Sequence, residues 1–249
     1  MEIKGKTVLV TGGAIRVGRA ITLGLAQAGA HVAVNYHHDA GQAAQTVQEA
    51  EALGVSALAV QADIAEWEQV KAMFAEIHGK LGPVDILVNN SSVFRQTPIP
   101  TASVEAWREV TGVLVNGAFY VSNLAAVDML EKKQGAIINI VDLTAWEAWP
   151  GFAAHVIGKS ALLALTRQLA IDLAPYVHVN AIAPGPILAP ADYSPEKIQK
   201  IAAKTLLDRW GTPEDIARTV NFLVESDYIN ADVITVDGGQ RYGHRKSDT

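Results

Sequence analysis

Residues 11–18 form a glycine-rich segment, Thr-Gly-Gly-Ala-Ile-Arg-Val-Gly, between a short β-branched run and a helical pattern. Glycines permit a tight turn and a close approach of the backbone to a pyrophosphate, whose charge then lies at the N-terminus of the next helix. In a doubly wound sheet, a dinucleotide binds at this turn. The cofactor contacts predicted here are Gly12, Ile15, Arg16, Val17 and Gly18.

The end of the second predicted strand indicates which nicotinamide cofactor binds. An NAD-preferring site usually has an acidic residue there, which binds the ribose 2′-hydroxyl and repels a 2′-phosphate. This chain has Tyr36, His37 and His38 instead, and with Arg16 they offer donors and positive potential. NADP(H) is therefore favoured over NAD(H). Two points weigh against this preference: Asp39 lies close by, and histidines are mostly neutral at pH 7. Arg16 is also consistent with a solvated surface charge.

The elements that position this turn alternate along the chain. Apolar faces at helical spacing separate the strands, and one such helix ends at Gly82-Pro83. Continuous apolar strands alternating with helices indicate a parallel sheet covered on both faces. We predict an α/β, Rossmann-type doubly wound parallel sheet of about seven strands, in one domain spanning residues 1–249. The strands predicted directly from the pattern are 7–10, 31–36, 57–61, 86–89 and 136–140.

Composition narrows the classes of function. The net charge of −6 argues against a nucleic-acid groove or an anionic membrane surface. The chain has no cysteine, its seven histidines lack ligand spacing, and His37 and His38 would point apart on a strand, so no metal site is expected. The first strand begins so close to Met1 that no signal peptide is expected, and no apolar run approaches a membrane span. These observations predict a cytoplasmic protein with a small-molecule substrate. The tail, residues 241–249, is polar and is expected to fray at its end.

The glycine turn resembles that of the short-chain dehydrogenase/reductase family, Thr-Gly-x-x-x-Gly-x-Gly, with Arg16 in place of the middle glycine. Further motifs of the family follow in order over nearly the whole chain. The resemblance implies that Asp63 and Ile64 lie at the adenine, that Asn90 and Ser91 follow the fourth strand, and that a Pro-Gly motif packs on the nicotinamide. It places Asn116 at the family's structural asparagine. The residues of the Pro-Gly motif are Pro184, Gly185 and Ile187, and Val236-Asp237-Gly238-Gly239 resembles the terminal strand and turn.

The catalytic motif departs from the family pattern. Family members use Ser, Tyr and Lys, with Tyr-x-x-x-Lys on one helix face. Here that motif reads His155-Val156-Ile157-Gly158-Lys159, and Asp142 replaces the serine thirteen residues before His155. The resemblance implies that Lys159 orients the nicotinamide ribose. Lys159 disfavours a charged imidazole at His155, whereas Asp142 favours it. If the effect of Asp142 is larger, Asp142 and His155 deliver the proton together; otherwise water or Asp142 delivers it.

A narrower resemblance is to pteridine reductases, which carry Arg and Asp at the positions of Arg16 and Asp142. In that branch a phenylalanine at the position of Phe94 stacks on the pterin, although Phe94 is also consistent with a core aromatic. Trp146 and Trp149 suit a substrate wall, a lid or ordinary packing.

Three hypotheses follow. The first is an NADPH-dependent reductase of a pterin-like or other planar substrate, with Asp142, His155, Lys159 and Asn116 in the catalytic set. The second is a reductase or dehydrogenase of an ordinary ketone or alcohol. The third is an NADP(H)-binding protein without turnover. The family resemblance also implies a homotetramer.

Overall fold

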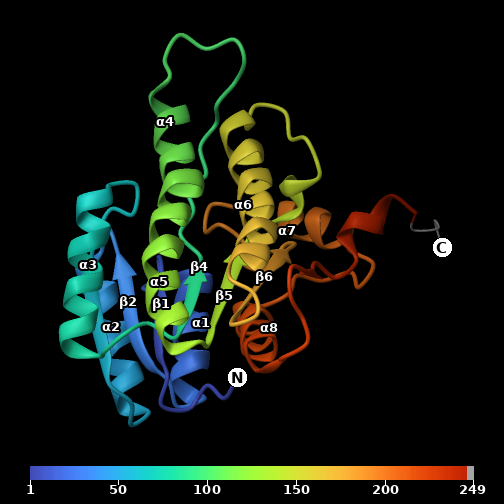
Figure 1. Cartoon of the computed structure of the whole chain (residues 1–249). Helices are drawn as coiled ribbons and strands as arrows, with labels where there is room; N and C mark the ends of the chain where they lie inside the picture. Colours follow the sequence, from blue (N-terminus) through green and yellow to red (C-terminus); the bar gives the residue numbers. More distant parts are fainter. Residues whose placement is uncertain (246–249) are drawn as a thin grey trace.

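The computed structural model describes residues 1–245, and its centre is one parallel sheet of seven strands in the order β3-β2-β1-β4-β5-β6-β7 (Figure 1). The predicted fold class is confirmed, because all six strand pairs are parallel and helices cover both faces. The strands are β1 Thr7–Val10, β2 His31–Tyr36, β3 Ala57–Gln61, β4 Ile86–Asn89, β5 Gly135–Ile140, β6 Val177–Pro184 and β7 Val233–Val236.

The helices form two layers that cover opposite faces of the sheet. Val8 and Val10 of β1 pack into the core cluster beneath α1, α2 and α8, whereas Leu9 between them packs into the cluster beneath α3, α5 and α6. Successive strand residues point to opposite faces, so a strand that is covered twice must be apolar throughout. The helices are α1 Arg16–Gln27, α2 Ala40–Ala52, α3 Trp67–Lys80, α4 Glu105–Thr111, α5 Ala118–Lys132, α6 Ala153–Asp172, α7 Pro195–Ala202 and α8 Pro213–Glu225.

A π-helical segment, Gly112–Gly117, joins α4 to α5 and makes one helix from Glu105 to Lys132. This helix is long and apolar enough to cross a membrane by length and composition, which the sequence pattern does not anticipate. In the fold it lies against the sheet, and Val121, Ala125 and Met129 are fully buried there. Its apolar character is therefore explained in part by core packing.

Short segments complete the chain. One 3₁₀ helix, Leu143–Ala145, follows β5, and another, Gln240–Arg245, follows β7. The predicted fraying concerns the end of the tail, which lies outside the described residues.

The strand order creates the place for a ligand. β1 pairs with β2 on one side and with β4 on the other, so the chain connections leave this point in opposite directions. A crevice forms outside the carboxyl ends of the strands where the order reverses in this way. In Figure 1 this edge is at the top, and the loop before α4 rises above it.

Candidate active site

The turn between β1 and α1 is too tight for any side chain at Gly18. A Cβ at Gly18 would lie 2.1 Å from the carbonyl oxygen of Gly12 and 2.6 Å from Nδ2 of Asn90. Asn90 Nδ2 donates to the carbonyl oxygens of Thr11 and Gly12 at 2.9 and 3.1 Å. Asn90, directly after β4, therefore fixes the tight conformation of the glycine turn.

The N-terminus of α1 is unusual at two residues. Ile15 occupies the N-cap and supplies no side-chain hydrogen bond, which leaves N–H groups of the first turn available to an anion. Arg16 has a φ of +52°, in the left-handed region that glycine adopts without penalty. For other residues this conformation costs roughly 1–2 kcal/mol. The position where the family has glycine thus keeps a glycine-like backbone while carrying an arginine.

The guanidinium of Arg16 crosses to the segment that follows β6. Its Nη2 donates to the carbonyl oxygen of Leu188 at 3.2 Å. Arg16 therefore bridges the first and the sixth strand connections on the ligand side of the sheet.

A groove of about 800 Å³ runs along this edge. Sequence reasoning missed Arg95 and Arg108, which also line it, and Arg95 Nε lies 3.1 Å from Oε2 of Glu109. The bare glycine turn, the uncapped helix N-terminus and a groove of this volume fit a nicotinamide dinucleotide. The predicted cofactor residues that line the groove are Gly12, Ile15, Arg16, Val17, Gly18, Tyr36, His37, His38, Asp63, Ile64, Asn90 and Ser91.

The two histidines after β2 lie side by side in the groove. Their ring centroids are 3.6 Å apart, because β2 ends at Tyr36 and strand alternation no longer applies. The expectation that His37 and His38 point apart is therefore wrong. His37 Nε2 also lies 3.8 Å from a carboxylate oxygen of Asp63. The paired rings and Arg16 all line the groove, and Asp39 caps α2 by accepting from the Gln42 N–H at 3.0 Å.

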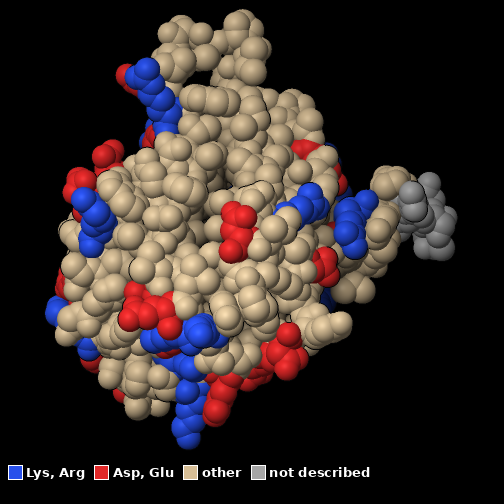
Figure 2. Space-filling model, viewed as in Figure 1, with Lys and Arg blue, Asp and Glu red and all other residues tan. Residues whose placement is uncertain are grey.

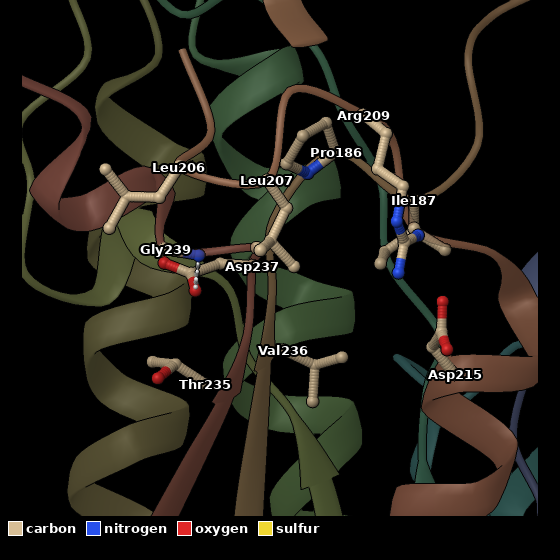
Figure 3. Close-up of a pocket in the computed structure, with 12 residues that line it drawn as sticks. Pro186, Ile187, Leu206, Leu207, Arg209, Asp215, Thr235, Val236, Asp237 and Gly239 are labelled. Carbon is tan, nitrogen blue, oxygen red and sulfur yellow. Dashed lines mark hydrogen bonds between the residues drawn. The ribbon is translucent and has the colours of Figure 1, made fainter. Parts of the chain in front are cut away.

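A second pocket, of about 400 Å³, lies at the carboxyl ends of β6 and β7 (Figure 3). Pro186 and Ile187 line it, and Arg209 extends toward Asp215 beside Ile187. A Cβ at Gly185 would lie 2.7 Å from the Cα of Asp237, so only glycine allows this approach of the two strand ends. The predicted residues Pro184, Gly185 and Ile187 thus lie at the end of β6, on the opposite side of the crevice from the glycine turn.

Asp142 and His155 form a hydrogen-bonded pair after β5. Asp142 Oδ2 is 2.8 Å from Nε2 of His155, and Oδ1 accepts from the backbone N–H and the hydroxyl of Thr144. Burial raises the pKa of Asp142, but the hydrogen bond from His155, the charge of Lys159 and the Thr144 hydroxyl outweigh it and lower the pKa. An ionised carboxylate only accepts hydrogen bonds, so Nε2 carries the hydrogen and Nδ1 is the nitrogen left for proton transfer.

Lys159 completes this cluster one helical turn after His155. Its Nζ donates to the carbonyl oxygen of Ile140 at 2.7 Å, and the residue is 3% exposed. Burial lowers the pKa of Lys159, and the carboxylate of Asp142 opposes this only in part. The ammonium group is therefore held in the site at a cost in stability.

We expect Lys159→Met to raise the melting temperature at neutral pH. The lowered pKa means that the folded protein binds this proton more weakly than the unfolded chain, so the penalty is present below the folded pKa and disappears as pH rises toward 10.5. Removing the buried charge should relieve about 1 kcal/mol of this penalty, which corresponds to a rise of roughly 2–4 °C in melting temperature. Thermal unfolding at neutral and alkaline pH measures the gain, which should shrink with pH. Lys71→Met, at a surface pair with Glu68, is the control; a Lys159→Met protein no more stable than that control would contradict the prediction.

A cluster of aromatic side chains lies on the His155 side of the Asp142–His155 pair. Phe94 stacks on Phe152 with ring centroids 4.5 Å apart, and its ring lies 4.9 Å from the imidazole of His155 in a perpendicular arrangement. Trp149 meets Phe94 edge to face at 6.4 Å. Trp146 makes no such ring contact within residues 1–245 and is 51% exposed. The structure thus brings Phe94 to the site together with Trp149 and Phe152, of which Phe152 was not predicted.

The predicted position of Asn116 in this cluster is wrong. Its side chain is exposed, whereas Leu114, two residues earlier, is 1% exposed and lies where a Cβ on Gly158 would meet it at 2.7 Å. Both residues belong to the π-helical segment. The side chain that this segment turns toward α6 is therefore Leu114.

Comparison with known proteins agrees with this geometry. A family model described as enoyl-(acyl carrier protein) reductase matches residues 13–241. The 3-oxoacyl-[acyl-carrier-protein] reductase FabG of Staphylococcus aureus is 36% identical over 239 residues, which cover 94% of this chain and 97% of that protein.

Solved structures share the fold, and two of them have a TM-score of 0.90 to this chain. A putative gluconate dehydrogenase from Agrobacterium tumefaciens is 35% identical, with 96% of this chain and 97% of that chain covered. FolM alternative dihydrofolate reductase 1 from Brucella canis, complexed with NADP, is 31% identical, with 100% and 97% covered. These matches show that the chain belongs to the short-chain dehydrogenase/reductase family of nicotinamide-dependent oxidoreductases.

Proposed function

We propose that this protein is an NADP(H)-dependent reductase of a small planar substrate, either pterin-like or carbonyl-containing. The observation that carries the proposal is the cluster of Asp142, His155 and Lys159 at the end of β5, with Phe94 against the imidazole. The similarity to a dihydrofolate reductase that was crystallised with NADP supports both the cofactor and the substrate class.

Lys159, Asp142 and His155 have separate roles in the proposed reaction. Bound NADPH supplies the hydride. Lys159 has donor capacity beyond its bond to Ile140, which we assign to the nicotinamide ribose. Asp142 fixes the imidazole so that Nε2 faces the carboxylate and Nδ1 is left for the substrate. In the imidazolium form Nδ1 donates a proton to the oxygen or nitrogen of the C=O or C=N bond whose carbon takes the hydride. In the neutral form it accepts that proton back, as substrate oxidation requires.

Arg16 is proposed to select NADP(H) by its charge, in competition with its bond to Leu188. We expect Arg16→Ala to weaken NADPH binding by about tenfold and NADH binding much less, since hydrogen bonds to charged groups contribute about 1.5–3 kcal/mol and part of this is offset by release of Leu188. Quenching of tryptophan fluorescence gives both affinities. Equal losses for the two cofactors would show that Arg16 does not discriminate. Arg19→Ala, on the same helix but paired with Glu49, is the control.

The proposed activity is tested with a substrate panel. Oxidation of NADPH is followed with a dihydropterin, a flat aromatic carbonyl compound and an open-chain 3-keto ester. Turnover of the planar compounds above the keto ester supports the proposal. The reverse order would favour the second candidate, a ketone reductase or alcohol dehydrogenase, which the similarity to FabG and to the putative gluconate dehydrogenase favours.

A third candidate is an NADP(H)-binding protein without turnover. The observation in its favour is that Nδ1 of His155 is buried and that histidine stands where the family has its tyrosine. NADPH binding without oxidation across the panel would support it.

Assembly into a homo-oligomer, as a tetramer in the cytoplasm, belongs to the same proposal. Figure 2 shows few charged side chains over the upper part of α6. Large apolar side chains are exposed on α5 and α6, which is typical of a protein–protein contact. These residues are Phe119, Val127, Leu130, Ile157 and Ile171.

A further inference from the structure

The ring nitrogen that the proposed reaction uses, Nδ1 of His155, is not accessible to a substrate. Nδ1 of His155 is buried and has no hydrogen-bond partner among residues 1–245, although buried polar atoms are nearly always paired. The whole residue is 3% exposed. A substrate atom must come within hydrogen-bonding distance of this nitrogen for proton transfer. Some group that covers His155 therefore has to move.

Phe94 is the group placed to move. Its ring lies against the imidazole at 4.9 Å, yet the residue is 57% exposed, so one side faces His155 and another faces solvent. Stacking on Phe152 and the edge contact with Trp149 hold it there. Such ring contacts are individually weak, so the side chain can leave without unfolding the surrounding core.

The loop that carries Phe94 is anchored at Thr97, three residues later in the chain. The N–H of Thr97 donates to the carbonyl oxygen of Gly151 at 2.7 Å, and its hydroxyl accepts from the N–H of Ala154 at 2.9 Å. Ala154 lies in the first turn of α6, whose N-cap, Phe152, provides no side-chain bond. Thr97 therefore caps α6, the helix that bears His155, and anchors the loop. Any motion of Phe94 is confined to the part of the loop before Thr97.

We propose that Phe94 is a specificity-determining gate over Nδ1 of His155. This inference rests on the proposed role of that nitrogen. In the closed position Phe94 stacks on Phe152, and its ring lies against the imidazole in a perpendicular arrangement. A flat ring favours opening, because it can take over the stacking that Phe94 gives up, whereas a flexible aliphatic ligand cannot.

The test measures access to His155 by chemical modification, which needs no turnover. The full-length protein is treated with diethyl pyrocarbonate near neutral pH, and the modified histidines are quantified by peptide mass spectrometry. Phe94→Ala should accelerate modification of His155 by roughly tenfold, the factor for the loss of a little over 1 kcal/mol of closing contacts. His37 and His38 serve as internal references and should react as in the parent.

Two variants complete the design. Ile99→Ala removes an exposed side chain from the same loop and should leave the His155 rate unchanged. Phe94→Trp keeps a large ring over the imidazole and should stay near the parent rate. An unchanged His155 rate in Phe94→Ala, with normal reaction of His37 and His38, would overturn the gate. A protein that turns over nothing but shows the acceleration would refute the proposed enzyme activity alone.

Discussion

Replacing His155 by alanine is expected to lower kcat roughly 10²–10⁴-fold, the usual contribution of a positioned acid. Cofactor affinity should change little, because His155 is placed to serve the substrate through Nδ1. Steady-state kinetics with the best substrate of the panel, together with NADPH titration, measures both. His155→Tyr is the informative companion, since it rebuilds the family's Tyr-x-x-x-Lys face and should retain or raise activity.

Substitutions can identify the group that delivers the proton. Asp142→Asn should also slow reduction, because it removes the carboxylate that holds the imidazole through Nε2. A His155→Ala enzyme as active as the parent would show that water or Asp142 delivers the proton. Activity only in His155→Tyr would identify the natural chain as a binding protein.

Gly18→Ala is expected to have the largest effect on both stability and cofactor binding. Its Cβ would lie 2.1 Å from a backbone oxygen of Gly12, which is a contact that no side-chain rotation can relieve. Overpacking of this kind costs about 3 kcal/mol or more, equivalent to roughly 6–12 °C in melting temperature. NADPH binding should be lost in parallel, because the turn has to open. Thermal unfolding and fluorescence titration measure the two effects.

Gly79→Ala is the matched control for that substitution. Gly79 lies in α3, and a Cβ there meets nothing within 4 Å. The change should be neutral or stabilising by up to about 1 kcal/mol, since alanine favours a helix interior. If Gly18→Ala behaved like Gly79→Ala, the close packing of the glycine turn would not matter for the fold.

Five of the seven strands could be predicted from the pattern, because their burial is a local property of the sequence. In a parallel sheet covered twice, each strand is a continuous apolar run, and 7–10, 31–36, 57–61 and 86–89 match the observed strands. The tight glycine turn was equally predictable, because Gly12 and Gly18, which pack against each other, are close in the sequence. Each of these patterns spans only a few consecutive residues.

The parts that could not be predicted depend on distant contacts or on an irregular helix. A π-helical turn holds more residues than an α-helical one, so it rotates the side chains that follow away from the ordinary period. Within this segment Leu114, rather than Asn116, packs close to Gly158 of α6. The bond from Arg16 to Leu188 spans 172 residues, and the ring cluster of Phe94 joins two loops, so neither leaves a local pattern.

The clamp between Asn90 and the glycine turn has a consequence for synthesis of the chain on the ribosome. Asn90 is translated 79 residues after Thr11, whose carbonyl oxygen it binds. At about 5–20 residues per second, the turn emerges roughly 4–16 s before the side chain that fixes it. The neighbouring strand β4 arrives with the same delay, and α8, which holds α1 through Asn221 and Gly24, arrives later still. We therefore expect nascent chains that end before Asn90 to be unable to retain a nucleotide, so that cofactor supply acts on nearly completed chains.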